Sequence, residues 1–394
     1  MTASVETAPL GRSFTARERA LSLAAVIAAS FGVGLAFGIG FPLTSLTLEG
    51  WDAPKWVLGV AGAAPAVAVM MVLPFLPSLV SRVGAVPAIA CGCLIAALGF
   101  IALSTVTSSA AWIAIRFVMS AGIALPWLVG ETWINTVSTE GTRGRIIALY
   151  AIAFFSGFAV GPALLSVLGD GLLPFVAGAL ATVLAGVPIV LARNLAPDLT
   201  HGEAIETRAA LSLAPIGMIG GFIGGFAEIS YISLLPNVAL ASGASEADAL
   251  HLLTMLTIGG GLLQFPLGWL ADKFNKASIS MLLALSFVVI SAFLPWVLGR
   301  PLLAPTMAFF LGGIVLGFYT VGLSVVGEQV SAKDIAAANA AFLVMYQAGA
   351  ILGPFAAGLA MSFDPVSGFI ATVSVLMLLS ALALYIFSRP KNTA

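Results

Sequence analysis

Twelve long segments with almost no charged residues constrain this chain more than any other feature of its sequence. They cover residues 20–47, 56–77, 86–106, 112–135, 146–167, 173–192, 211–236, 251–270, 278–298, 306–329, 337–358 and 367–388. A helix needs about 20 apolar residues to cross roughly 30 Å of hydrocarbon. Only 8% of the 394 residues are charged, whereas soluble domains are about 25% charged. The sequence therefore predicts an all-α polytopic membrane protein with twelve transmembrane helices.

The basic residues predict how these helices are oriented. Of the 16 Lys and Arg, 13 fall in the tails or in the alternate loops on the same side as the tails, and the exceptions are Lys55, Arg116 and Arg300. Because such loops stay in the cytoplasm, we expect both termini to be cytoplasmic and the protein to be a multi-pass protein of the inner membrane. The first segment is too long for a signal peptide and is expected to remain as a helix.

Several classes of function have no support in the sequence. Cys91 and Cys93 lie two apart in the third segment, on different helix faces, and the two histidines lie in or beside loops. We expect no disulfide, no metal cluster and no catalytic Ser-His or Cys-His arrangement, and therefore neither an enzyme nor a cofactor. No Walker-type phosphate loop occurs, and a net charge of −1 suggests no nucleic-acid partner.

The sequence contains an internal repeat, and each repeat spans six predicted helices. "VGE" at 129–131 repeats at 326–328, and "GP" at 161–162 repeats at 353–354, at offsets of 197 (326 − 129) and 192 (353 − 161). Parallel repeats of this kind build secondary transporters with a site at the repeat interface near the middle of the membrane. The predicted parts are a tail (1–19), a first bundle (20–192), a linker (193–210), a second bundle (211–388) and a tail (389–394), expected to form a monomer in the bilayer.

Three motifs resemble those of the major facilitator superfamily. "GWLADKFNK" (268–276) is similar to its loop signature, with Gly268, Asp272, Lys273 and Lys276 matching. Asn275 replaces a glycine, and because asparagine tolerates the left-handed conformation that glycine would supply, the turn can survive. "RFVMSAGIA" (116–124) is similar to the fourth-helix motif, Arg116 being its arginine, although Met119 and Ser120 depart from the pattern.

The third motif, "GFAVGP" (157–162), resembles a fifth-helix motif of proton-driven antiporters through Gly157, Gly161 and Pro162. The same pattern recurs in the second half at Gly349, Gly353 and Pro354. Small residues four apart let helices approach closely, and proline bends a helix. The motif therefore indicates helix packing or a seal against proton leak.

The resemblance also implies a cytoplasmic latch. In this superfamily the acid of each signature loop meets the start of the fifth or eleventh helix in the other half. Asp272 would then face Arg143 and Arg145, whereas the first-half loop has Ser81 at the acidic position. We expect one asymmetric latch that stabilises the outward-facing state. The alternative is a solvated charged loop that sets the topology.

Four charged residues lie inside the predicted helices: Arg116, Glu131, Glu228 and Glu328. An ionisable group at the bilayer centre costs about 3 kcal/mol or more, so it normally faces a cavity or a partner. The resemblance places all four on cavity-forming helices, with roles in proton coupling or gating. Glu228 stands where the matching stretch of the first helix, "AFGIGFP", is apolar, so it is the leading candidate for proton coupling.

For each of these residues a structural alternative stays open. Glu228 could bridge helices by hydrogen bonds, and Arg116 could anchor two helices. The repeated Gly-Glu of Glu131 and Glu328 could reflect inherited packing, and Glu328 lies near enough to its helix end to reach water.

Aromatic and amide side chains on the same helices are candidates for recognising the solute: Phe37, Phe41, Trp127, Tyr231, Gln264, Tyr319, Tyr346 and Gln347. Aromatic faces with few amides suit a partly apolar or cationic solute, although any one of them could instead pack against lipid or a neighbouring helix. The function predicted from these features is proton-coupled export of a small amphipathic solute by alternating access. The alternative is a proton-coupled importer of a sugar or organic acid.

Overall fold

The computed structural model describes residues 14–139, 141–199, 210–331 and 334–388, which form helices joined by short turns. Twelve of these helices are long and apolar enough to cross a membrane, so the predicted fold class is confirmed. The predicted segments of the two tails at 1–13 and 389–394, and residues 200–209 of the predicted linker, lie outside the described part of the chain. The helices are α1 (Ala16–Gly50), α2 (Lys55–Val72), α3 (Leu76–Val83), α4 (Ala85–Leu103), α5 (Ser109–Val137), α6 (Arg143–Leu168), α7 (Leu173–Leu191), α9 (Pro215–Ala241), α10 (Glu246–Lys273), α11 (Lys276–Val297), α12 (Leu303–Gln329), α13 (Ile335–Met361) and α14 (Ser367–Ser388).

The second predicted segment is less regular than the others. After α2 the chain forms a 3₁₀ turn at Leu73–Phe75 and then the short helix α3. Pro74 and Pro77 are the local cause, because proline supplies no backbone N–H and crowds the preceding turn. Gly84 then ends α3 with a φ of 87°, a conformation that glycine adopts without strain.

The corresponding turn in the second half differs from the sequence-based expectation. Asn275 has a φ of −61° and not the left-handed conformation of the glycine that it replaces. Its side-chain oxygen accepts a hydrogen bond of 3.0 Å from the N–H of Ser278, so Asn275 is the N-cap of α11. Capping satisfies an N–H that the helix leaves unpaired, which explains the extended backbone at this position.

The repeat in the sequence is also a repeat in packing. In the first half α1 packs on α6 and α7, and in the second half α9 packs on α13 and α14 in the same way. Gly157 and Gly161 of α6 bring that helix against the backbone of α1, where a Cβ atom would overlap Phe31 and Gly38. The same close approach recurs between α13 and α9, so the glycine motif is a helix-packing element in both halves.

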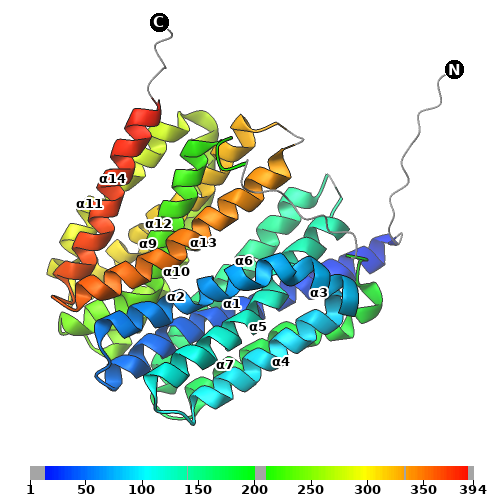
Figure 1. Ribbon diagram of the computed structural model, residues 1–394, viewed down its shortest axis with the longest axis horizontal. Coiled ribbons are helices and arrows are strands. Elements are labelled where there is room, and N and C mark those ends of the chain that lie inside the picture. Colours follow the sequence, from blue (N-terminus) through cyan, green and yellow to red (C-terminus); the bar gives the residue numbers. More distant parts are fainter. Residues whose placement is uncertain (1–13, 140, 200–209, 332–333, 389–394) are drawn as a thin grey trace, which may run out of the picture.

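The two halves meet mainly along four helix pairs: α2 with α13, α6 with α10, α1 with α9, and α2 with α9. Figure 1 shows α2 and α13 converging at the lower left of the view and diverging toward the upper right. We call the end of the bundle where α1 begins and α14 finishes the terminal end, and the other end the opposite end. The described helices of the halves lie closest at the opposite end.

Small residues make that closure possible. Gly59 of α2 lies against the carbonyl oxygen of Pro354 in α13, and a Cβ on Gly358 would lie 2.8 Å from the Lys55 carbonyl oxygen. The neighbouring stretches of α1 and α9 are continuously buried over residues 32–45 and 230–239. Backbones in such direct contact exclude water and solute, so the opposite end is closed.

Candidate functional site

Glu228 lies on the buried helix α9 and is held by a residue of α13. The Tyr346 hydroxyl donates a hydrogen bond of 2.8 Å to Glu228 Oε2. The two side chains meet because Gly225 and Gly349 let the backbones of α9 and α13 touch on either side of this level. Glu228 as a residue is half-buried.

A second tyrosine extends this site toward the first half. Tyr319 of α12 packs edge-on against Tyr346, with ring centroids 5.4 Å apart, and against Phe342 at 5.1 Å. Tyr319 lies within electrostatic range of both Glu228 and Glu131, although these carboxylates belong to different halves. The structure therefore brings Glu131, Glu228, Tyr319 and Tyr346 into one region, which we call the central site.

The first half contributes a row of aromatic side chains to the central site. Glu131 Oε1 accepts a hydrogen bond of 2.9 Å from Trp127 Nε1. Trp127 meets Phe37 edge-on at 6.1 Å, and Phe37 stacks on Phe41 at 6.0 Å. Glu131 is exposed, so the terminal-end side of the central site is accessible.

Arg116 lies at the far end of the same aromatic row. Its guanidinium carbon is 5.1 Å from the centroid of the Phe41 ring, and the residue is only 1% exposed. Its side-chain nitrogens have no hydrogen-bond partner among the described residues. Arg116 therefore does not hydrogen-bond Glu228 in this conformation, and Glu228 accepts a hydrogen bond from Tyr346 instead.

Glu328 is placed apart from the central site. Lys276 Nζ lies 2.7 Å from Glu328 Oε2, and the Glu328 side chain is 64% exposed. Lys276 belongs to α11 and Glu328 to α12 of the same half, and both lie near the terminal end. This position agrees with the alternative that Glu328 reaches water at its helix end.

Tyr231 is also placed away from the space between the halves. Its hydroxyl lies 2.8 Å from Ser291 Oγ, and its ring packs edge-on against Phe369 at 4.9 Å and Phe287 at 5.6 Å. These contacts hold α9 against α11 and α14 inside the second half, so Tyr231 stabilises the fold. Of the predicted amides, Gln347 is buried beside Tyr346 and Gln264 is half-buried on α10.

The residues of the predicted latch are not brought together in this conformation. Asp272, Arg143 and Arg145 are exposed, and no ion pair joins Asp272 to either arginine among the described residues. Lys273 Nζ lies 4.0 Å from the centroid of the Trp269 ring in the same helix, and Gly268 directly precedes Trp269. Latch residues without an ion pair are what a bundle open at the terminal end requires.

The structure reveals a cross-half contact at the opposite end that the sequence reading missed. Asn237 of α9 is fully buried and donates from Nδ2 to the Ser45 carbonyl oxygen at 3.2 Å and to Glu49 Oε2 at 3.1 Å. Glu49 also forms an ion pair with Lys55 at the start of α2. We call Asn237, Glu49 and Lys55 the opposite-end clamp; the isolated Lys55 on a side otherwise poor in basic residues was the available signal.

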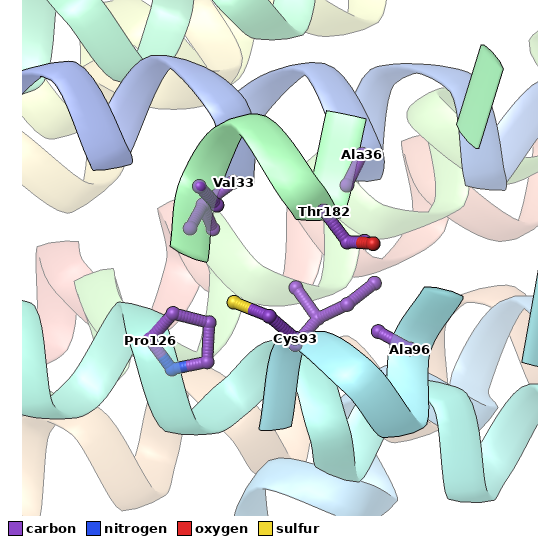
Figure 2. A pocket seen from close by; sticks show the side chains of 8 residues that line it. Val33, Ala36, Cys93, Ala96, Pro126 and Thr182 are labelled. Carbon is purple, nitrogen blue, oxygen red and sulfur yellow. The ribbon is translucent and has the colours of Figure 1, made fainter. Parts of the chain in front are cut away.

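A small cavity inside the first half is separate from both sites. Figure 2 shows Cys93, Pro126 and Val33 among the side chains around it, and Thr182 is the polar residue that lines it. The Thr182 hydroxyl donates to the Ala179 carbonyl at 2.7 Å, so its hydrogen is already used. Cys91 is exposed and Cys93 buried, so the predicted difference in helix face is confirmed.

The central site has the chemistry of proton and cation binding. Two carboxylates from different halves lie among phenol and indole groups, and the described residues contain no group of three or more His, Cys, Asp or Glu side chains that could hold a metal ion. Carboxylates exchange protons, and aromatic faces attract cations. A site closed at one end and accessible from the other suits a solute that enters and leaves without crossing lipid.

Comparisons with known proteins agree with the repeat and the fold. Residues 217–394 match the model described as Major Facilitator Superfamily, and residues 6–172 match the one described as MFS_1 like family. The uncharacterized MFS-type transporter YcaD of Salmonella enteritidis PT4 is 31% identical over 286 residues, which are 72% of this chain and 74% of that protein.

Two solved structures show the same fold at low identity. The nucleoside transporter NupG has a TM-score of 0.72 at 14% identity, covering 94% of this chain and 100% of that one. The xylose transporter XylE from E. coli, in a partially occluded inward open conformation, has a TM-score of 0.70 at 13% identity, covering 94% and 99%.

Proposed function

Because the chain belongs to the Major Facilitator Superfamily of membrane transporters, we propose that it exports a small amphipathic solute in exchange for protons. The proton would bind at Glu228, and the solute would occupy the space between Glu228, Glu131 and the aromatic row. The proposal places the protein in the inner membrane as a monomer, with both termini in the cytoplasm. In that orientation the terminal end is the cytoplasmic end, and the described conformation is inward-facing.

The observation that carries this proposal is the setting of Glu228. One hydrogen bond from Tyr346 holds the carboxylate, and none of the described Lys or Arg residues forms an ion pair with it. The ionisable groups that interact with it are Tyr346 and Tyr319, and Tyr319 also interacts with Glu131. An acid so placed is tolerated when protonated and needs water or a cation when ionised.

Transport then follows from alternating closure of the two ends. In the inward-facing state Glu228 releases its proton to the accessible cytoplasmic side, and the ionised site accepts the solute. Closure of the terminal end by Asp272 with Arg143 or Arg145 accompanies separation of the opposite-end clamp. External protons then displace the solute, and the protonated transporter returns to the inward-facing state.

A proton-coupled importer is the second candidate. It needs the same carboxylates and differs in binding proton and solute together. XylE and a D-xylose-proton symporter share the fold with this chain at 13% and 14% identity. Sequence identity of 13–14% supports a shared fold and not a shared substrate. The scarcity of amide side chains around the central site favours export of a less polar solute.

The test uses purified protein in liposomes that contain a pH-sensitive dye. Cationic, neutral and anionic solutes are added, and solute-evoked proton flux is compared between the unmodified protein, Glu228→Gln and the control Glu246→Gln. Glu246 is an acid in the first turn of α10 outside the central site. We expect flux to vanish in Glu228→Gln with solute counterflow retained, and to persist in the control.

The direction of the flux separates the two candidates, because antiport and symport move protons oppositely for the same solute gradient. Unchanged flux in Glu228→Gln would assign that carboxylate a structural role and contradict the proposal.

A further inference from the structure

The positive charge of Arg116 has no counterpart in the part of the chain that the structure describes. Its Nε, Nη1 and Nη2 atoms are buried without a hydrogen-bond partner, and the Phe41 ring is the nearest favourable contact. Leaving a buried charge unpaired costs several kcal/mol, far more than a cation–π contact of about 1–2 kcal/mol returns. Arg116 therefore requires an anionic partner or its equivalent.

Arg116 lines a narrow gap between the two halves that is too small for a water molecule in this conformation, and we call this gap the cavity. Ser233 of α9 lines this cavity from the second half; it is 2% exposed, and its hydroxyl also has no partner among the described residues. Thr44 and Ser45 of α1 line it too, but their hydroxyls donate to the carbonyls of Gly40 and Pro42 in their own helix. The groups left to bind an occupant are hydrogen-bond donors, which suits an anion.

The carboxylates that could compensate Arg116 are engaged elsewhere. Glu228 accepts from Tyr346 at 2.8 Å, and Glu49 accepts from Asn237 at 3.1 Å and pairs with Lys55. Neither is hydrogen-bonded to Arg116, whose side-chain nitrogens remain without a partner among the described residues. The charge must then be balanced by an ion from solution.

We propose that Arg116 and Ser233 bind a single halide ion between the two halves, with chloride as the physiological candidate. A monatomic anion accepts hydrogen bonds from any direction, so a guanidinium and one hydroxyl can hold it. A carboxylate needs room for two oxygen atoms and would have to displace the Phe41 ring that lines the cavity under Arg116 further than a halide would. Even a halide requires small shifts of the Phe41 ring and α9.

The position of the ion gives it a conformational effect. Arg116 belongs to the first half and Ser233 to the second, so a bound halide contacts both and stabilises the closed opposite end. The halide would act in this way whichever solute is carried and whether or not transport is coupled to protons. Halides should therefore favour the described conformation.

Thermal unfolding of the purified full chain tests the proposal. Sodium gluconate is replaced by sodium chloride or bromide at constant ionic strength, and the melting temperature is recorded for the unmodified protein, Ser233→Ala, Arg116→Gln and Ser242→Ala. Ser242 is the exposed residue that ends α9, the helix of Ser233, and its hydroxyl donates to the Val238 carbonyl oxygen at 2.9 Å. We expect a saturable rise with either halide, an apparent affinity about tenfold weaker in Ser233→Ala, and no change in the control.

The same measurements can overturn the proposal. Halide effects that are equal in Ser233→Ala and the unmodified protein, or absent from both, would exclude this site. An equal rise with acetate or formate would replace the halide by a carboxylate and contradict the assignment. Should Arg116→Gln fail to fold, Ser233→Ala decides alone, and anomalous diffraction from bromide at Arg116 gives the direct positive result.

Discussion

The two ends of the contact between the halves are built from different chemistry. At the opposite end Gly59, Pro354 and Gly358 bring two backbones together, and buried Asn237 bonds across the halves to Glu49. At the terminal end the candidate contacts are exposed charges on Asp272, Arg143 and Arg145. A buried interface acts through steric fit and desolvated hydrogen bonds, whereas exposed ion pairs contribute about 0–1 kcal/mol. The comparison shows why the described conformation is closed at the opposite end.

The largest effect on this comparison is expected from Gly59→Ala. A Cβ at this position would overlap the Pro354 carbonyl oxygen across the halves. Overpacking costs about 1–3 kcal/mol, which shifts an equilibrium about 5- to 150-fold toward the state open at the opposite end. Distances between spin labels at Asp52 and Ser242, in a protein with both native cysteines replaced, report the shift.

Gly144→Ala is the matched control for that change. Gly144 has no atom within 4 Å of an added Cβ, so the label distances should stay as they are. Unchanged distances in Gly59→Ala itself would mean that the α2–α13 contact does not hold the opposite end closed.

Asn237→Ala should have the next largest effect. It removes the two hydrogen bonds to Ser45 and Glu49, and a bond to a charged group contributes about 1.5–3 kcal/mol. Because Glu49 keeps Lys55 as a partner, we expect a shift of about tenfold toward opposite-end opening, measured with the same labels. Asn135→Ala, which removes an exposed amide bonded to the Glu131 carbonyl of its own helix, is the control and should give no shift.

Asp272→Asn tests the terminal end and should act in the reverse direction. The exposed side chain makes no ion pair with Arg143 or Arg145 in the described conformation, so the variant alone should leave the label distances unchanged. Combined with Gly59→Ala it should restore part of the closed population, by about 1 kcal/mol or less and less still at high salt. Identical distributions of the label distance in Gly59→Ala and in the double variant would exclude the latch.

Asp364→Asn should have the smallest effect, because its contacts lie within one half. The Ser367 hydroxyl and N–H donate to Asp364 Oδ1 at 2.7 and 2.6 Å at the start of α14, which lowers the pKa of this exposed carboxyl. A lowered pKa means that the stabilisation is present at neutral pH and is lost as the pH falls below about 4. The protection of amides in the first turn of α14 against hydrogen exchange, relative to the intrinsic exchange rate at each pH, should therefore fall on acidification in the unmodified protein.

In Asp364→Asn that pH dependence should be absent, and the label distances should not change at any pH. A change in the distances would show that the α13–α14 turn contributes to closure, contrary to the comparison.

The sequence was most informative where the structure depends on local composition. Apolar length predicts a helix because a lipid-exposed backbone must satisfy its own hydrogen bonds, and the twelve segments were found in that way. The glycine motif was recognisable because glycine removes the side chain at a close contact, at Gly157 and Gly349 alike. Glu228 stood out because a carboxylate in an apolar helix is expensive.

Other residues could not be assigned from their type or spacing. Tyr231 and Tyr346 look equivalent in the sequence, yet one packs inside the second half and the other bonds to Glu228. The rotation of each helix decides between these outcomes, and it is set by neighbours far along the chain. The backbone of Asn275 could not be predicted for a related reason, because its role as the N-cap of α11 determined its conformation.

By itself the sequence determined the number of helices, their order, the two-fold repeat and the residues whose charge is costly in a bilayer, because these properties depend on the residues within each segment. The tertiary structure alone decided the partners. Asn237 meets Glu49 across 188 residues, Glu228 meets Tyr346 across 118, and Arg116 meets no acid at all among the described residues. Those contacts depend on the rotation of each helix and on which distant helices pack against it, within a half for Glu228 and between the halves for Asn237, and no single segment encodes that packing.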